Sequence, residues 1–110
     1  MKARRTIPMK DIRSIAKRIA EKFDVEKIIL FGSYAYGKPA TTSDIDLCVV
    51  METKDRPFAK SLEILQALTP LQFGVDIIVR NEKDFKRRIP QGDIFLEDIW
   101  NRGTVLYDKQ

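Results

Sequence analysis

The chain has 110 residues, of which 44% are hydrophobic and 33% are charged. This length supports one domain with a real core but not two, so we expect a single domain over residues 1–110. The sequence contains one cysteine and no histidine, which excludes an internal disulfide, a cysteine-rich zinc site and Ser-His-Asp or Cys-His catalysis. Any acid–base or metal chemistry must therefore use carboxylates.

The net charge of +4 is unevenly distributed, because residues 1–27 hold nine basic and four acidic residues. A solvated helix face explains this pattern better than a nucleic-acid surface, since no aromatic residues alternate with the charges. We therefore expect no direct nucleic-acid binding. No apolar run has the length of a membrane span or a signal peptide, and we expect a cytoplasmic protein without a membrane partner. The basic residues are Lys2, Arg4, Arg5, Lys10, Arg13, Lys17, Arg18, Lys22 and Lys27.

The first half of the chain predicts a helix followed by two strands. Apolar residues from Ile12 to Phe23 recur at helical spacing, with Lys and Arg on the opposite face. Residues 26–31, EKIILF, predict a short strand that ends at Gly32, and residues 33–43 resemble a turn. Residues 45–51, IDLCVVM, predict a central strand because both of its faces become apolar.

The second half predicts three further helices and two strands. Residues 57–69 predict a second helix with Leu62, Leu65 and Leu68 on one stripe and Ile64 beside it, and Pro70 ends it. A strand over residues 75–79 and a short helix over 82–88, capped by Asn81, follow. A helix over 93–101 and a strand over 104–107 complete the chain. The order predicts an α/β (α+β) fold in which helices flank a small mixed β-sheet.

The segment GSYAYGK, residues 32–38, fits the G-x-x-x-x-G-K pattern of a P-loop. A P-loop continues with Ser or Thr, whose hydroxyl holds Mg²⁺, and it opens directly into a helix. Here Lys38 is followed by Pro39, and a strand begins within a few residues. Both the chemistry and the context exclude a P-loop.

The carboxylates of Asp44 and Asp46 are one residue apart at the start of the predicted central strand. Side chains at i and i+2 of a strand point the same way, so both carboxylates should project from one face. Two like charges this close favour a bound cation, and hard oxygen ligands without His or Cys favour Mg²⁺. The pair is therefore a candidate for two-metal chemistry at phosphorus.

Two further features complete this candidate site. Gly32 and Ser33 follow a strand, where glycine allows close backbone approach and the serine can cap the turn and donate to a phosphate oxygen. Asp76 is the one acidic residue in the apolar run VDIIV, and a buried unpaired carboxylate is costly. We expect Asp76 to face a metal ion or solvent, and to assist an acceptor hydroxyl.

In combination these residues resemble a known signature. Phe31-Gly32-Ser33, ten residues and then Asp44-Ile45-Asp46-Leu47 are similar to the signature of the DNA polymerase β-like nucleotidyltransferases, in their minimal nucleotidyltransferase branch. The resemblance runs from about residue 27 to residue 79. It implies that Asp44, Asp46 and Asp76 are catalytic and hold metal ions, and that Gly32 and Ser33 bind the triphosphate. Many minimal members have arginine where this chain has Tyr36.

The resemblance also implies a partner and a reaction. Minimal members pair with an all-helical HEPN ribonuclease toxin, as its antitoxin, and can transfer AMP from ATP to a tyrosine of that toxin. We therefore expect ATP as substrate and Mg²⁺, with two ions, as cofactor; formation of homo-oligomers stays open. The alternative is a catalytically silent binding protein that neutralises a helical partner by occlusion. Its candidate contact residues, which core packing also explains, are Phe95, Leu96, Ile99, Trp100 and Tyr107.

Overall fold

The computed structural model describes residues 6–37 and 39–110, and it arranges them as five helices and four strands. Lys2, Arg4 and Arg5, and Lys38 of the excluded P-loop pattern, lie outside the described residues. Among the described helices, none has the length and apolar character needed to cross a membrane. The elements are α1 Met9–Lys22, β1 Lys27–Phe31, α2 Ser33–Tyr36, β2 Ile45–Val50, α3 Pro57–Leu68, β3 Val75–Arg80, α4 Glu82–Arg88, α5 Ile94–Arg102 and β4 Thr104–Asp108.

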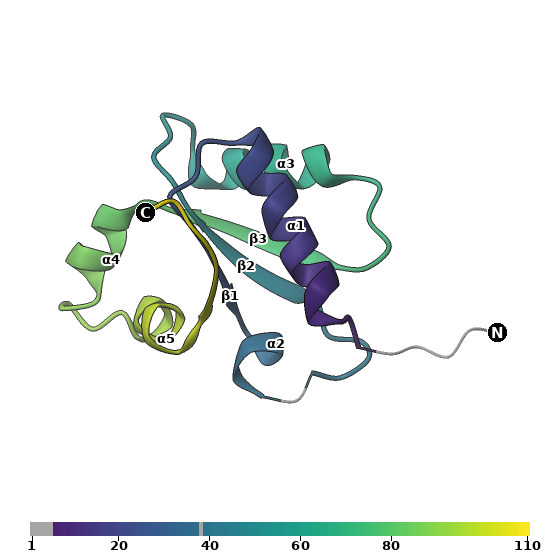
Figure 1. The fold of residues 1–110 in the computed structure, drawn as a ribbon. Helices are drawn as coiled ribbons and strands as arrows, with labels where there is room; N and C mark the ends of the chain where they lie inside the picture. The colour runs from purple at the N-terminus through teal and green to yellow at the C-terminus, as the bar shows by residue number, and fades with distance from the viewer. Residues whose placement is uncertain (1–5, 38) are drawn as a thin grey trace.

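The four strands form one mixed sheet in the order β3-β2-β1-β4 (Figure 1). β2 pairs in parallel with β3 and antiparallel with β1, and β1 pairs antiparallel with β4. The parallel pair needs a crossover connection, which α3 supplies. The predicted fold class, a small mixed sheet flanked by helices, is confirmed.

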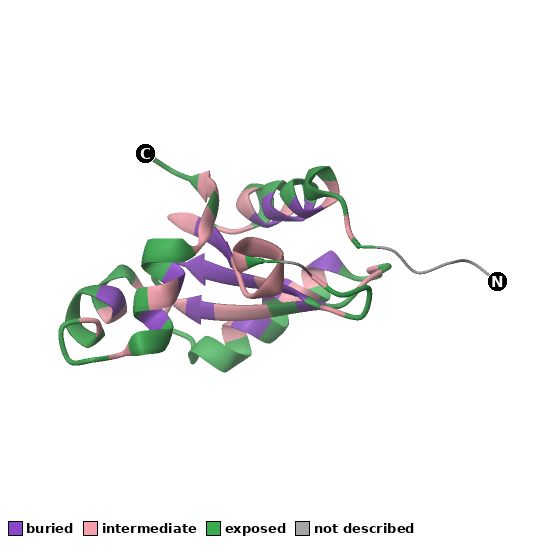
Figure 2. Cartoon of the chain, turned by 90° about the horizontal axis from the view of Figure 1, so that it is seen from below, coloured by how far each residue is buried: buried purple, intermediate pink, exposed green. Residues whose placement is uncertain are grey.

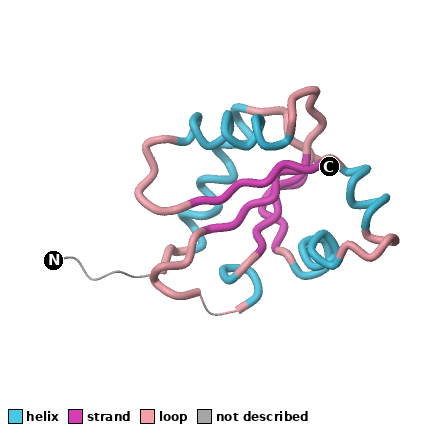
Figure 3. Tube along the Cα trace, turned by 180° about the vertical axis from the view of Figure 1, so that it is seen from behind, coloured by secondary structure: helices cyan, strands magenta, loops and turns pink. Residues whose placement is uncertain are grey.

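Helices cover both faces of the sheet. α1 and α3 lie on one face, and α4 and α5 lie on the other (Figures 1 and 3). β2 serves both layers: Leu47 and Val49 pack in the α1/α3 core, whereas Cys48 and Val50 pack in the α4/α5 core. This confirms the central position predicted for β2. Burial is concentrated on the strands and on the sides of the helices that face them (Figure 2).

The short helices α4 and α5 begin at well-formed caps. Asn81 accepts a hydrogen bond from the Asp84 amide at 2.8 Å, and the Asp84 carboxylate accepts one from the Asn81 amide at 3.1 Å. Asp93 caps α5 by accepting from the Leu96 amide at 2.9 Å. These caps satisfy amides that a helix start leaves without partners, and they confirm the predicted starts of both helices.

The buried side of α3 differs from the predicted stripe. Ser61, Ile64 and Leu68 are buried, whereas Leu62 is 43% exposed. Residues spaced three apart, counted from Leu62, do not stay on one side of a helix that has 3.6 residues per turn. Positions 61, 64 and 68 follow the helical period better and share one side. The Ser61 hydroxyl donates to the Phe58 carbonyl at 2.8 Å, so this buried polar group is satisfied.

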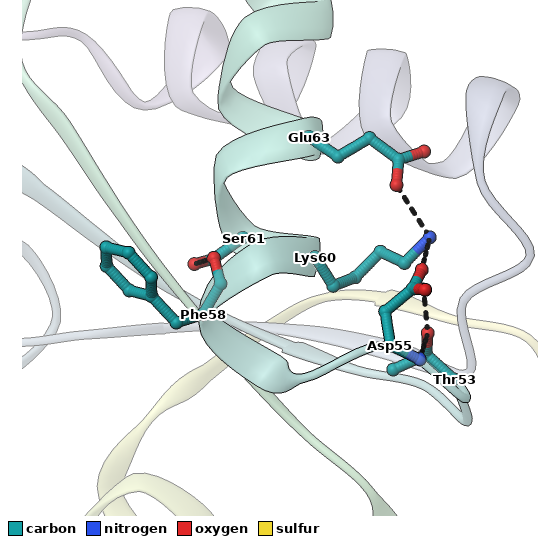
Figure 4. A network of polar contacts seen from close by, with 6 residues as sticks. All are labelled: Thr53, Asp55, Phe58, Lys60, Ser61 and Glu63. Atoms are coloured by element: carbon teal, nitrogen blue, oxygen red, sulfur yellow. Dashed lines mark hydrogen bonds and ion pairs between the residues drawn. The ribbon is translucent and has the colours of Figure 1, made fainter.

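The solvent side of α3 begins with a small ionic network (Figure 4). The Lys60 ammonium lies 3.0 Å from an Asp55 carboxylate oxygen and 2.9 Å from one of Glu63. Figure 4 shows Phe58 on the other side of the helix, where it is 74% exposed. Surface ion pairs of this kind each stabilise a fold by no more than about 1 kcal/mol, so α3 is held chiefly by its buried side.

Truncating Ile64 and Leu62 separately tests this assignment of the α3 sides. We expect Ile64→Ala to lower the free energy of unfolding by about 2–5 kcal/mol, because it leaves a cavity in the core. Leu62→Ala should change it by less than about 1 kcal/mol. Urea unfolding followed by circular dichroism measures both values. A larger cost for Leu62→Ala than for Ile64→Ala would contradict the observed packing.

Candidate active site

The three predicted carboxylates lie at one end of the parallel β2–β3 pair. Asp46 and Asp76 are register partners in the parallel β2–β3 pair, so their side chains project from the same face of the sheet. Asp44 lies two residues before Asp46, directly ahead of β2, where the Ile45 amide donates to the Gly74 carbonyl at 3.0 Å. This face is the one that α5 covers further along the strands, because Cys48 and Val50 share it.

Burial and the neighbouring carboxylates together perturb the pKa of Asp46. Burial raises the pKa of Asp46 above its ordinary value of 3.8, and the charges of Asp76 and then Asp44 raise the pKa further. Burial disfavours the charged form of Asp46 itself, and the two neighbouring carboxylates disfavour a further negative charge. A bound cation would oppose the repulsion between these charges.

The raised pKa of Asp46 predicts how the metal-free protein responds to pH. Because the pKa of Asp46 is higher in the folded protein than in the unfolded chain, protonation of this carboxyl stabilises the fold. This stabilisation is complete at pH values below the ordinary pKa and is lost as the pH rises through the raised pKa of the folded protein. In EDTA at pH 7 we therefore expect Asp46→Asn to melt about 2–4 °C above the wild type. The difference should shrink as the pH falls toward 4. Thermal melts at several pH values measure it, and a difference that grows on acidification would contradict the prediction.

Gly32 allows the turn after β1 to approach Asp46. Its φ is +75°, and a Cβ atom at this position would overlap the Asp46 Oδ2 atom. Only glycine combines this backbone conformation with so close a carboxylate. Gly32 thus allows a close approach to the Asp46 carboxylate, and its expected approach to a phosphate stays a prediction.

The expected cap by Ser33 is wrong. Gly32 occupies the N-cap position of α2, no side chain caps this helix, and Ser33 is its first residue. The chain turns at Gly32, which has a positive φ, so the helix already begins at Ser33. A serine cap would require the helix to begin one residue later. The Ser33 hydroxyl is thus not used as a helix cap.

Gly74 is a site residue that the sequence analysis missed. A Cβ atom at Gly74 would overlap the Asp44 Oδ1 atom, so this glycine makes room for Asp44 as Gly32 does for Asp46. The available signal was a glycine directly before the strand that carries Asp76. Two glycines therefore fix where two of the three carboxylates can lie.

Replacing Gly74 tests that arrangement. Gly74→Ala should move the Asp44 carboxylate and lower the rate of nucleotidyl transfer by about tenfold, because small misplacements at a reacting centre are costly. The free energy of unfolding should change by less than about 1.5 kcal/mol, since no positive φ is involved at Gly74. Initial rates and urea unfolding measure the two effects. Unchanged rates would show that the position of Asp44 is unimportant.

The chemistry of the three carboxylates suits a hard divalent cation. Their oxygens are the ligands that Mg²⁺ prefers. Burial raises the pKa of Asp46 most, and the charges of Asp76 and Asp44 raise it further, so neighbouring negative charge acts on this carboxyl. Among the described residues, however, no three Asp, Glu, Cys or His side chains are arranged so that together they could hold a metal ion. A metal ion would therefore need additional oxygens, which nucleotide phosphates provide.

The two principal hollows of the described residues lie elsewhere. One, of about 480 Å³, opens at the other end of the sheet between Lys27, Trp100 and Asp108. The other, of about 290 Å³, lies between α1 and the segment before β3, on the opposite face from the carboxylates. Neither hollow is lined by Asp44, Asp46 or Asp76.

The residues expected to form a binding surface divide into two groups. Leu96 and Ile99 are buried in the α4/α5 core, as ordinary packing predicts. Phe95 is 50% exposed and Trp100 is 38% exposed. Phe95 packs edge-on against Phe31 with ring centroids 5.7 Å apart. Because Phe31 is the register partner of Asp46, Phe95 lies on the carboxylate side of α5.

Comparison with known proteins identifies the family. A family profile described as "Nucleotidyltransferase domain" matches residues 12–100, which include all three carboxylates and Gly32. The chain belongs to the nucleotidyltransferase family. The predicted enzyme class, nucleotidyltransferase, is confirmed.

A relative and two solved structures agree with this assignment. A Methanocaldococcus jannaschii protein named "Putative protein adenylyltransferase" is 34% identical over 102 residues, which are 89% of this chain and 96% of that protein. The crystal structure of "a putative nucleotidyltransferase" from Sulfolobus solfataricus has a TM-score of 0.65 at 22% identity, over 92% of this chain and 80% of that one. A mutant of the toxin–antitoxin MntA–HpeT has a TM-score of 0.57 at 22% identity, over 94% and 76%. Both structures share the fold.

Proposed function

We propose that this protein is a Mg²⁺-dependent nucleotidyltransferase that transfers AMP from ATP to a tyrosine hydroxyl of a HEPN ribonuclease toxin. In this role it is a cytoplasmic antitoxin. The observation that carries the proposal is the meeting of Asp46 and Asp76 as register partners, beside Asp44 and the glycine turn after β1. Family membership over residues 12–100 and the name of the M. jannaschii relative support it.

The residues of the site have separate tasks in this reaction. The Gly32–Ser33 turn binds the triphosphate, and Asp44 and Asp46 would hold the metal ions that orient the α-phosphorus. Asp76, on the outer strand β3 and exposed to solvent, accepts the proton of the acceptor hydroxyl or holds the second ion. The acceptor oxygen forms a bond to the α-phosphorus, the bond between the α- and β-phosphates breaks, and pyrophosphate leaves.

Two Mg²⁺ ions, held by Asp44, Asp46 and Asp76, would neutralise the phosphate charge and polarise the α-phosphorus. The chain itself contributes positioning and an electrostatic environment. The strands hold Asp46 and Asp76 side by side, and Gly32 and Gly74 leave room for Asp46 and Asp44 in the positions seen here.

A labelling experiment tests the proposal. The chain is incubated with Mg²⁺, ATP labelled at the α-phosphate and a candidate HEPN-type helical protein, and transfer of label to that protein is measured. Label on a tyrosine of the partner, lost with EDTA, is the expected result. ATP labelled at the γ-phosphate is the matched control and should transfer nothing.

The second candidate function is neutralisation of a helical partner by occlusion alone. The exposed apolar residues Phe95 and Trp100 on α5 favour it. It predicts no label transfer, and neutralisation that survives Asp44→Ala combined with Asp46→Ala. The enzyme proposal predicts that the double variant loses both transfer and neutralisation.

A further inference from the structure

One side of helix α5 lies next to the carboxylates. Phe31 and Asp46 are opposite each other in the antiparallel β1–β2 pair, so both project from the face that α5 covers. Phe95 contacts Phe31 from α5. Arg102 lies seven residues, or about two turns, further along the same helix and therefore on the same side. The side of α5 that carries Phe95 and Arg102 faces the candidate site.

Arg102 rests on the ring of Tyr36. The centre of its guanidinium lies 4.4 Å from the Tyr36 ring centroid, and its nearest acid is Asp98, at 3.7 Å one turn earlier on α5. The Arg102 side chain is nevertheless 56% exposed, and an exposed ion pair of this length is weak. Tyr36 belongs to α2, which directly follows the Gly32 turn. The guanidinium is thus held near that turn while its donors remain accessible.

Tyr36 connects this contact to the glycine turn. Its hydroxyl is buried and has no hydrogen-bond partner among the described residues. Burial raises the pKa of Tyr36, Asp98 and Asp46 raise it further, and the Arg102 charge and the Gly32 amide oppose the rise. The backbone amide of Tyr36 donates to the Gly32 carbonyl at 3.0 Å, and the Tyr36 ring contacts Arg102. Tyr36 therefore links the Gly32 turn to α5.

The strand order determines on which side of the site the leaving group departs. In an in-line displacement the acceptor and the leaving group are on opposite sides of the phosphorus. In the order β3-β2-β1-β4, Asp76 on β3 and the Gly32 turn after β1 lie on opposite sides of Asp46. With the acceptor hydroxyl beside Asp76, pyrophosphate must leave on the β1 side, toward α2 and Arg102.

We propose that Arg102 binds the β- and γ-phosphates of the nucleotide, and that Tyr36 is the residue that positions it. This inference rests on the proposed function, because it assigns the triphosphate to the Gly32 turn. The planar guanidinium can donate two parallel hydrogen bonds to phosphate oxygens, which an ammonium cannot reproduce. Arg102 lies beyond residues 12–100, the part of the chain that the family profile matches.

Calorimetric titration with a non-hydrolysable ATP, the α,β-methylene analogue, in Mg²⁺ tests this role. Arg102→Leu should weaken binding of the analogue by about tenfold or more, the effect of one lost charged contact. Binding of AMP, which lacks the β- and γ-phosphates, should change by less than about twofold. Arg87→Leu is the matched control, because it removes the same charge from an exposed position on α4, and it should bind the analogue like the wild type.

Variants of Tyr36 separate positioning from general stability. Tyr36→Phe keeps the ring and should bind the analogue within about twofold of the wild type, whereas Tyr36→Leu should weaken binding nearly as much as Arg102→Leu. The double variant Tyr36→Leu with Arg102→Leu should bind the analogue about as weakly as Arg102→Leu alone, because both substitutions remove the same contact. Thermal melts confirm that each variant is folded, and Arg102→Lys, which keeps the charge, provides an intermediate affinity.

The outcomes distinguish the two proposals. A wild-type protein that binds neither the analogue nor Mg²⁺·ATP would overturn the proposed function, and the role of Arg102 with it. A wild type that binds the analogue, with Arg102→Leu binding it equally well, would overturn only the role of Arg102. Equal weakening of the analogue and of AMP would also overturn it, because the contact would then not be with the β- and γ-phosphates.

Discussion

Asp46→Asn should lower AMP transfer by at least about a thousandfold and leave the protein folded. Asparagine keeps the shape of the side chain but removes the charge that a metal ion needs, and loss of charge stabilisation at a reacting centre commonly costs factors of this size. Asp46 is the central carboxylate: it lies opposite Asp76 on β3 and against the Gly32 turn. Transfer from α-labelled ATP measures the loss.

The matched control for this variant is Asp24→Asn. Asp24 precedes β1 at the other end of the sheet, and its carboxylate pairs with Lys109 at 3.0 Å on the surface. The chemical change is the same, and we expect the transfer rate to stay within about twofold of the wild type. A similar loss in both variants would point to stability or net charge. Full activity of Asp46→Asn would remove Asp46 from the metal site.

The sequence was sufficient for the order of the elements except α2, because most local signals agreed with one another. Residues 33–43 were expected to form a turn, whereas Ser33–Tyr36 form a short helix. Both faces of the strand become apolar after Asp46, which predicted a strand covered on both sides. Leu47 and Cys48 are indeed buried in different layers. The Asn81 cap predicted the start of α4. The pairing of Asp46 with Asp76 agrees with the expectation that both lie at one site, although their roles as metal ligands stay a prediction.

The features that the sequence did not predict depend on contacts between distant segments. Gly74 is far from Asp44 in the sequence and meets it only because β2 and β3 pair in parallel. Arg102 and Tyr36 meet because α5 crosses β1 beside α2. The buried side of α3 was misassigned because three leucines at a spacing of three suggested a stripe that the helical period does not keep. Periodicity within one element cannot determine which partner that element meets.

The glycine turn itself gives the second large effect that we expect. Gly32→Ala should reduce AMP transfer by about a hundredfold and lower the free energy of unfolding by about 1–3 kcal/mol. Two physical causes act together at this position. The backbone is at a φ of +75°, which disfavours any side chain, and the added Cβ would overlap the Asp46 carboxylate. Transfer rates and urea unfolding measure the two effects.

Other glycines of the chain separate these causes. Gly92 has a φ of +96° but no atom within 4 Å of an added Cβ, so Gly92→Ala should lose stability and keep its transfer rate. Gly37 has neither a positive φ nor such a neighbour, so Gly37→Ala should change little. If Gly92→Ala lost as much activity as Gly32→Ala, general destabilisation would explain the effect. If only Gly32→Ala is inactive, the close approach of the turn to Asp46 is what the reaction requires.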